Sequence, residues 1–442
     1  MRFAMGIGIG VAMQMGFVSA GQALNLQESI QKVLDDNPKI QAAKSERRAV
    51  EEEIDQARAG YFPTVDVTAG IGWEESNNPT TRGRGDGSVF YHREEGAIQV
   101  RQMLFDGLAT PNEVERQEKR TDSRAYTVFG QSEITALDGV EAYLKVLRRQ
   151  ELLNLAKDNL QLHLRTNEQI KLRSERGVGK RADVDQSMGR VALAEKNVWS
   201  ETGNLKDAET GFQRVIGILP DAVEPVAAPT AALPATMEQA IDEALAEHPI
   251  LKSANSDIES AFAQHNTAMA PYFPRFDIET GVSHNYNLDG IRGTNSDMTA
   301  MLRMRYNIFN GGKDIARREQ TAQLINQAKD IRDNTHRQVV ESMRLSWVAY
   351  QTVKSQMEFF KQHAEAAEKT INAYQQQFNI GQRTLLDLLD TFNEMYIAKS
   401  SLINAKYDEL FSQYRILASK GQLNKYLGTQ LPAEVQPVSL AD

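Results

Sequence analysis

The two halves of this chain carry the same motifs in the same order. Tyr61-Phe62-Pro63 returns as Tyr272-Phe273-Pro274, and Leu104-Phe105-Asp106-Gly107 returns as Ile308-Phe309-Asn310-Gly311. In each half, the spacing of apolar residues predicts a helix, two strands, a very long helix and a returning helix. Self-similarity of this kind indicates an internal two-fold structural repeat, which constrains the fold more than any other feature of the sequence.

The repeat divides the chain into five segments. Residues 1–23 combine a basic residue, an apolar stretch and a small-residue cleavage site, which is typical of a secretory signal peptide. We expect the first repeat over 24–217, a proline-rich linker over 218–236 and the second repeat over 237–421. Residues 422–442 are expected to form a C-terminal segment outside the repeats.

Each half contains one pair of predicted strands, about ten residues long, which is the length of a transmembrane β-strand. Apolar residues alternate with polar ones from Val65 to Trp73 and again from Phe276 to Tyr286. Four strands cannot close a barrel, and an open sheet edge in hydrocarbon leaves backbone amides unpaired at high cost. If lipid covers the apolar face, several copies of the chain must therefore combine their strands.

The polar face of these strands bears on the number of copies. Two copies would give about eight strands, whose barrel is filled by its own side chains, and three would give about twelve. Charged side chains need a water-filled lumen, so the pattern favours at least three copies. The alternative is an ordinary hairpin packed on the helices, because alternation does not tell whether lipid or protein covers the apolar side. The charged residues expected in the lumen are Asp66, Arg101, Asp277, Glu279, Arg303 and Arg305.

The long helices are predicted from stretches without proline. No proline occurs from residue 112 to residue 176, and a helix of that length would be about 100 Å long. Leu137, Val140, Leu144 and Leu147 follow the 3-4-3 spacing that is typical of coiled coils. Such narrow apolar stripes fit the wall of a tube that is wet on both faces, in agreement with the mean hydropathy of −0.47.

The composition excludes several classes of function. The chain has no cysteine, which excludes a disulfide framework, a thiolate metal site, a cysteine nucleophile and a lipid-bearing N-terminal cysteine. The net charge of −9 has no accompanying basic stripe, so nucleic acid is not an expected partner. The histidines are scattered, and neither a phosphate-binding loop nor a Gly-x-Ser-x-Gly elbow occurs. We therefore expect no enzymatic activity, no cofactor and no structural metal.

The second turn between long helices carries two acids. Gly381 permits the reversal, and Thr384 and Asp387 have the spacing of a capping box. Asp387 and Asp390 are three residues apart and share one helix face. They are either a helix cap beside a solvated face or the mouth of a pore, and Arg383 is either a plain turn cation or part of that mouth.

These features resemble the TolC family of outer-membrane efflux and secretion proteins over essentially the whole mature chain. Besides the duplicated motifs, the resemblance rests on Gly177-Val178-Gly179-Lys180-Arg181-Ala182-Asp183-Val184 and on the ten residues from Gly381 to Asp390. It implies a mixed α/β membrane protein that forms a homotrimer. Its twelve-stranded transmembrane β-barrel, with four strands per protomer, would be continuous with a long periplasmic α-helical coiled-coil barrel. The linker and the C-terminal segment would lie at the equator of that tunnel.

The resemblance also implies a location and partners. The location is the outer membrane of a Gram-negative bacterium, with the tunnel reaching into the periplasm. The partners are outer-membrane lipid, a periplasmic membrane-fusion adaptor and an inner-membrane ABC transporter or proton-driven efflux pump, which must supply the energy.

Particular residues acquire roles by the same resemblance. Asp387 and Asp390 would form the pore constriction at the periplasmic tip, where three copies bring together about six carboxylates and permit block by multivalent cations. Arg383, Thr384 and Asp183 would form a gating network. A family tyrosine is Phe378 here, so one hydroxyl of the closing network is missing. The tip glycines expected where the adaptor docks are Gly177, Gly179 and Gly381.

The function expected first is the exit duct of a type I secretion system, which exports protein cargo. The alternative is the outer-membrane component of a multidrug efflux pump. A periplasmic coiled-coil adaptor would explain the helices but not four strands with charged faces, and a diffusion porin would explain the strands but not helices about 100 Å long.

Overall fold

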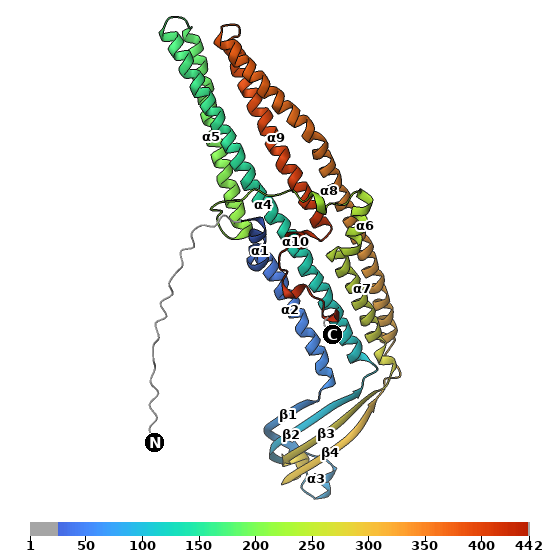
Figure 1. Ribbon diagram of the computed structural model, residues 1–442. Helices are drawn as coiled ribbons and strands as arrows, with labels where there is room; N and C mark the ends of the chain where they lie inside the picture. Colours follow the sequence, from blue (N-terminus) through green and yellow to red (C-terminus); the bar gives the residue numbers. More distant parts are fainter. Residues whose placement is uncertain (1–24, 441–442) are drawn as a thin grey trace, which may run out of the picture. The chain divides into compact units, whose positions relative to one another are not determined.

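The computed structural model describes residues 25–440 (Figure 1), so the predicted signal peptide at 1–23 lies outside the described residues. The described chain divides into two units. The helical unit comprises residues 25–33, 138–228 and 354–411, and the sheet unit comprises residues 34–137, 229–353 and 412–440. The two long helices α4 (Ala109–Glu175) and α8 (Lys313–Asn379) contribute residues to both units.

The sheet unit contains one antiparallel sheet with strand order β1-β2-β3-β4 (Figure 1). The first half of the repeat supplies β1 (Thr64–Ser76) and β2 (Val89–Phe105), and the second supplies β3 (Arg275–Tyr286) and β4 (Thr294–Arg305). Pairing of β2 with β3 joins the two halves. Because β1 and β4 each have only one neighbour, the sheet of a single chain is open at both edges.

The strands begin and end differently from the prediction at one place. The alternation predicts the returning strand of the first half around Ile98, but β2 begins at Val89. Phe90 stacks on Trp73 with ring centroids 5.5 Å apart, and this cross-strand pair extends the ladder. The loop before β2 contains the short helix α3 (Pro79–Gly83) behind an Asn78 capping box.

The two faces of the sheet differ in chemistry as predicted. Cross-strand register places the six residues expected in the lumen on one face. The other face is apolar and exposed in the single chain, and Val67 and Ile71 there are 73% and 77% exposed. Further exposed apolar residues of this face are Val65, Trp73, Phe90, Ile98, Val282, Met298, Leu302 and Met304.

Each half starts with two helices that pack beside a long one. In the first half these are α1 (Leu26–Asp36) and α2 (Pro38–Arg58), and in the second they are α6 (Met237–Glu247) and α7 (Pro249–Ala268). The second helix of each pair begins with proline, whose missing N–H costs nothing at that position. Asn37 Oδ1 accepts the Lys39 N–H at 3.0 Å, and His248 Nδ1 accepts the Ile250 N–H at 3.3 Å.

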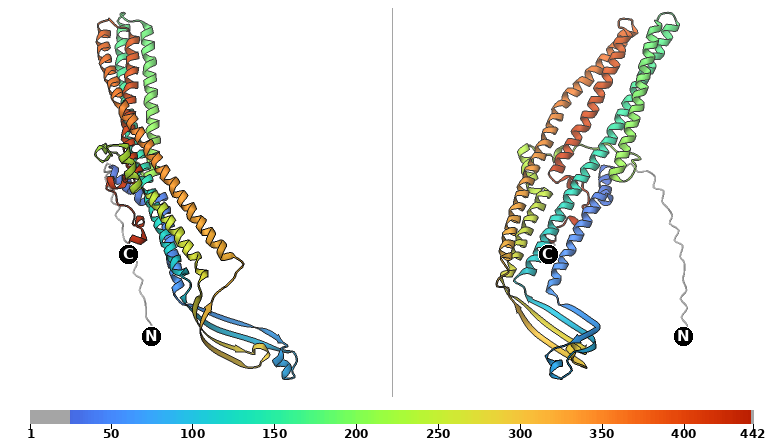
Figure 2. Two further views of the ribbon diagram at one scale, coloured as in Figure 1. Left: turned by 90° about the vertical axis from the view of Figure 1, so that its right-hand side faces the viewer. Right: turned by 180° about the vertical axis from the view of Figure 1, so that it is seen from behind.

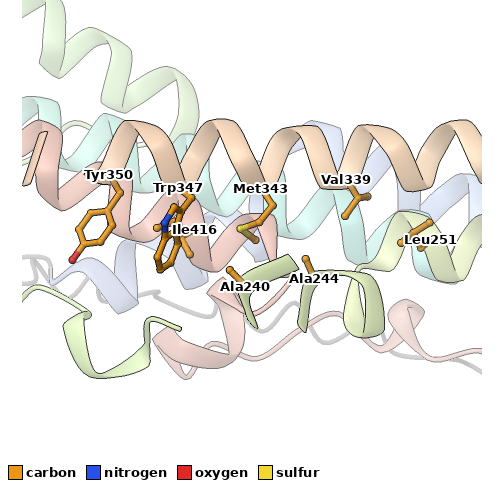
Figure 3. Packing of buried hydrophobic residues seen from close by; sticks show 8 residues of the cluster. All are labelled: Ala240, Ala244, Leu251, Val339, Met343, Trp347, Tyr350 and Ile416. Carbon is orange, nitrogen blue, oxygen red and sulfur yellow. The ribbon is translucent and has the colours of Figure 1, made fainter. Parts of the chain in front are cut away.

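The helical core of the sheet unit lies between α6, α7, α8 and α9 (Leu385–Ser419) (Figure 3). Met343, Trp347 and Tyr350 project from α8 onto Ala240, Ala244 and Ile416, and the rings of Trp347 and Tyr350 meet edge to face. These α8 residues therefore form a packing seam.

The C-terminal segment packs on helices of the sheet unit. Glu434 forms ion pairs with Arg48 and Lys44 of α2, and the Ser439 N–H donates to Asp122 Oδ1 of α4 at 3.2 Å. The segment contains α10 (Leu423–Leu427). Short 3₁₀ turns occur at Ala59–Tyr61, Thr230–Ala232, Ala270–Tyr272, Leu288–Gly290, Ala433–Val435 and Val438–Leu440.

The helical unit consists mainly of two hairpins. One joins α4 to α5 (Arg181–Ile216), and the other joins α8 to α9 (Figures 1 and 2). Both long helices contain 67 residues, which corresponds to about 100 Å. Within residues 25–440, none of the helices has the length and hydrophobicity needed to cross a bilayer.

Candidate functional site

The turn between α8 and α9 is shaped by a glycine and a capping box. Gly381 has a φ of +79°, which favours glycine. The Thr384 hydroxyl accepts the Asp387 N–H at 3.2 Å, and the Asp387 carboxylate accepts the Thr384 N–H at 3.4 Å. Asp387 therefore caps the helix, and its side chain is still partly open to solvent, with 41% of it exposed.

Arg383 holds the turn against α8. Its guanidinium donates to Gln377 Oε1 at 3.0 Å and lies 4.2 Å from the centroid of the Tyr374 ring. Its contact with Asp387 is longer, at 3.9 Å. Within the described part of one chain, Arg383 forms no ion pair with Asp183, so a single protomer does not bring these two predicted network members together.

Asp390 joins the two hairpins. Its carboxylate lies 2.7 Å from the guanidinium of Arg190, which projects from α5. No sequence pattern indicates this contact, because the two residues are 200 positions apart. Arg190 is therefore a site residue that sequence reasoning missed, and it partly offsets the charge of one of the two predicted constriction acids.

An apolar cluster lies behind the acids. Leu388 and Leu389, between Asp387 and Asp390, are buried against Ile170, Ile371, Phe378 and Phe392. The Arg173 guanidinium lies 4.8 Å from the centroid of the Phe378 ring. Packing of the leucines fixes the rotation of α9, so the acids project from a helix whose opposite face is immobilised.

His163 adds a buried polar group to this cluster. Its ring meets Phe392 edge to face at 5.3 Å. Burial, with a smaller effect of the Arg190 charge, lowers the pKa of His163 to about 4. The imidazole is therefore neutral at physiological pH and acts as a packing group.

The turn between α4 and α5 also depends on glycine. Gly177 has a φ of +76°, and a Cβ on Gly179 would lie 3.0 Å from the backbone nitrogen of Ser174. Val178 between them is 79% exposed. The two glycines therefore allow a tight turn that exposes an apolar side chain at its tip.

On the sheet, five of the six charged residues expected in the lumen form one network. Asp277 is fully buried and pairs with Arg305 at 2.7 Å, while Glu279 pairs with Arg303 at 2.6 Å and with Arg101 at 3.2 Å. Asp66 lies on the same face of β1 but outside the network. Among residues 25–440, no group of three His, Asp or Glu side chains is placed to bind a metal ion.

Comparison with known proteins identifies the family. The family model for "Outer membrane efflux protein" matches residues 29–218 and 240–422, one match in each half. The outer membrane efflux protein BepC of Brucella suis is 26% identical, covering 96% of this chain and 91% of BepC. The outer membrane protein TolC of Escherichia coli is 24% identical, covering 93% of this chain and 85% of TolC.

Solved structures share the fold. The outer-membrane channel OprN superposes with a TM-score of 0.76 at 17% identity, covering 90% of this chain and 89% of OprN. A structure of CusC gives a TM-score of 0.72 at 14% identity, covering 93% of this chain and 96% of CusC.

These matches confirm the resemblance and the expected fold class, a homotrimer with four strands per protomer in a twelve-stranded barrel continuous with a helical tunnel. They also confirm the expected adaptor and transporter partners and the outer membrane of a Gram-negative bacterium as the location. Proteins of this family are channels, not enzymes. This chain therefore belongs to the outer membrane efflux protein family.

Proposed function

We propose that this outer-membrane channel is the exit duct of a type I secretion system, which passes protein cargo from an ABC transporter and its adaptor to the exterior. The support is the similarity to relatives named for secretion. The alkaline protease secretion protein AprF of Pseudomonas aeruginosa is 23% identical over 91% of this chain. The proteases secretion protein PrtF of Dickeya chrysanthemi is 22% identical over 94% of it.

The second candidate is the exit duct of a multidrug efflux pump. The observation that favours it is the match to BepC, which is named as an efflux protein and is 26% identical over 96% of this chain. Both candidates use the same barrel and tunnel, and they differ in the transporter that loads the tunnel.

Deletion of the gene in its native host separates the two candidates. For a secretion duct, we expect proteins to disappear from the culture medium and to return when the wild-type gene is restored, as measured by mass spectrometry of the medium. Minimum inhibitory concentrations of unrelated drugs should stay unchanged. An unchanged set of secreted proteins, together with a fall in drug tolerance, would replace secretion by drug efflux.

We further propose that Asp387 and Asp390 form the constriction of the closed channel and that Arg383 helps to keep it closed. The two acids lie beside the α8–α9 turn with a packed face behind them, and three copies would place about six carboxylates around one axis. Thr384 supports this arrangement by capping α9. Asp183, on the neighbouring hairpin, would contribute across the boundary between protomers.

Planar-bilayer recordings test the constriction. We expect Asp387→Ala combined with Asp390→Ala to lower cation selectivity and to abolish block by multivalent cations, because the anionic ring is removed. Arg383→Ser should raise conductance by loosening the turn. Wild-type selectivity in the double variant would place the constriction elsewhere.

Two further roles are proposed on the same grounds. The Gly177, Gly179 and Gly381 turns are the docking point of the adaptor, because they form the exposed ends of both hairpins. The ion-pair network around Asp277 and Glu279 lines the lumen of the barrel, because it occupies the face opposite the exposed apolar one.

A further inference from the structure

A cavity of about 290 Å³ lies in the sheet unit, where the end of α9 meets the start of α7. Residues of α4 and α8 complete its walls. Lys420, directly after α9, pairs with Glu243 of α6, and a Cβ on Gly421 would lie 2.8 Å from the Pro249 ring. These contacts hold the end of α9 against the start of α7, so the cavity has well-packed walls.

Much of the cavity wall is aliphatic. Val339 also belongs to the packed core beside α6 (Figure 3), which fixes the α8 side of the wall. Ile134 of α4 and Ile250 of α7 are 49% and 41% exposed, so apolar surface remains open to water there. The cavity holds roughly ten times the volume of a water molecule, which fits an apolar ligand of roughly ten non-hydrogen atoms.

Arg415 of α9 adds a positive charge to this apolar wall. Within residues 25–440, its guanidinium forms neither an ion pair nor a hydrogen bond. Glu133 also lines the cavity, but its carboxylate accepts the N–H groups of Leu423 and Asn424 in the C-terminal segment. A guanidinium beside aliphatic side chains, without a carboxylate of its own, favours an anionic ligand.

His248 adds a second hydrogen-bond donor to the wall. Burial lowers the pKa of His248 to about 4, so the imidazole is neutral at physiological pH. Its Nδ1 accepts the Ile250 N–H at 3.3 Å, which places the ring proton on Nε2. The imidazole N–H and the Arg415 guanidinium together supply the kind of donors that bind a carboxylate.

The first half of the repeat differs at the equivalent junction. When the halves are aligned on their shared motifs, Arg415 corresponds to Gly211 and Ile250 corresponds to Lys39. The first half forms its own helix end and helix start without the cation and without this apolar side chain. Packing of such a junction therefore does not require them, and binding of a ligand gives them a role.

We propose that this cavity binds a small organic anion with an apolar body, such as a medium-chain fatty acid. The carboxylate of the ligand contacts Arg415 and His248. Its apolar chain lies against Ile134, Ile250 and Val339. The proposal adds a small-molecule site to the wall of the duct, and it holds whether the cargo is protein or drug.

Octanoate is a suitable probe, because it joins a carboxylate to an unbranched apolar chain of the right size. Ser342→Cys places a thiol on the cavity wall of a chain that has no cysteine of its own. In trimers reconstituted in lipid nanodiscs, octanoate at about ten times its dissociation constant should slow maleimide labelling of this thiol about tenfold, because only empty sites react. Glu341→Cys is the matched control, because Glu341 is exposed on the same helix outside the cavity, and its labelling rate should not change.

Octylamine and octanol separate the effect of charge from partition of an apolar chain. They carry the same chain with a positive charge and with no charge, so neither should protect the Ser342→Cys thiol at the octanoate concentration that does. This comparison uses one protein and needs no further variant. Equal protection by all three compounds, or equal protection of both thiols, would overturn the proposal.

Arg415→Gln in the Ser342→Cys protein tests the proposed cation. Protection by octanoate should be lost, whereas Arg415→Lys, which keeps the positive charge, should retain part of it. Equal labelling rates of these proteins without octanoate show that the cavity is intact. Full protection in Arg415→Gln would contradict the proposed contact with the carboxylate.

Discussion

At the scale of single residues, the surroundings of a charged group decide what it can do. The sequence pattern predicts a helix cap for Asp387 but not for Asp390, and in the structure Asp387 caps α9 while Asp390 pairs with Arg190 at 2.7 Å. Exposed pairs of this kind contribute only about 0–1 kcal/mol each. If these acids form the constriction, as proposed, three copies of the link lie in one ring and together oppose separation of the hairpins.

Two variants, Arg190→Ala and Asp390→Asn, distinguish the effect of the Arg190–Asp390 ion pair from the effect of the Asp390 negative charge. Both changes cut the contact between α5 and α9, so both should raise single-channel conductance in planar bilayers. Arg190→Ala leaves the Asp390 carboxylate without its counter-charge and should raise cation selectivity, whereas Asp390→Asn should lower it. If the two variants changed selectivity in the same direction, Asp390 would not face the ion pathway.

Glu133 is a buried carboxyl group that anchors the C-terminal segment. It accepts the Leu423 N–H at 2.9 Å, the Asn424 N–H at 3.2 Å and the Asn424 side-chain amide at 3.0 Å. Burial outweighs these hydrogen bonds and raises the pKa of Glu133 from 4.5 to about 7. A raised pKa means that the folded chain holds the proton more tightly than the unfolded chain, so its contribution to stability is complete below pH 4.5 and is lost as pH rises through about 7.

Glu133→Gln removes this titration at nearly constant volume. The free energy of unfolding of the wild type relative to Glu133→Gln should fall by up to about 3 kcal/mol between pH 5 and pH 8. Denaturation midpoints of both proteins over that range measure the difference. His248, whose pKa burial lowers to about 4, is common to both proteins and cancels. A pH-independent difference would show that Glu133 does not titrate in this range.

At the scale of elements, the repeat supplies its own controls. Gly107 and Gly311 occupy equivalent positions after β2 and β4, with φ values of +74° and +72°. A Cβ on Gly107 would lie 2.4 Å from the Ala270 carbonyl oxygen, whereas a Cβ on Gly311 would meet nothing within 4 Å. The two positions therefore have the same backbone conformation but differ in the room available for a side chain.

Gly107→Ala should thus destabilise the protein more than Gly311→Ala. Gly311→Ala is opposed only by the left-handed backbone conformation, which costs an alanine about 1–2 kcal/mol. In Gly107→Ala, the new methyl group also forces the α7–β3 connection at Ala270 to move. Thermal dissociation of detergent-solubilised trimers compares the two variants, and equal effects would mean that this connection yields freely.

The sequence predicted elements better than contacts. Periodicity located all four strands and both long helices, because each has one face of uniform polarity over many residues. It did not locate α3, which depends on the local capping box of Asn78, or the early start of β2, which depends on Phe90 meeting Trp73 across the sheet. Arg190 was missed because its partner belongs to the other repeat, and a single sequence does not encode which hairpin faces which.

At the scale of the whole molecule, the sheet is what makes one chain insufficient. Its four strands leave two open edges, and its outer face exposes Val67, Ile71 and other apolar side chains. Water disfavours the apolar face and lipid disfavours the unpaired edges. Both costs disappear only when three copies close the barrel within a membrane, so assembly and insertion are coupled.

Neighbouring residues on β1 test this coupling. Val67 and Thr68 are both exposed in the single chain but point to opposite faces of the sheet. Val67→Arg places a charge against lipid at a cost of about 2–4 kcal/mol per copy near the bilayer midplane, repeated in each protomer. Thr68→Arg places the same charge in the lumen, where water solvates it.

We expect Val67→Arg to reduce the amount of trimer recovered from outer membranes severely, whereas Thr68→Arg should assemble normally and lower cation selectivity in planar bilayers. The opposite outcome would mean that the apolar face of the sheet is turned toward the lumen and that the charged network lies outside it.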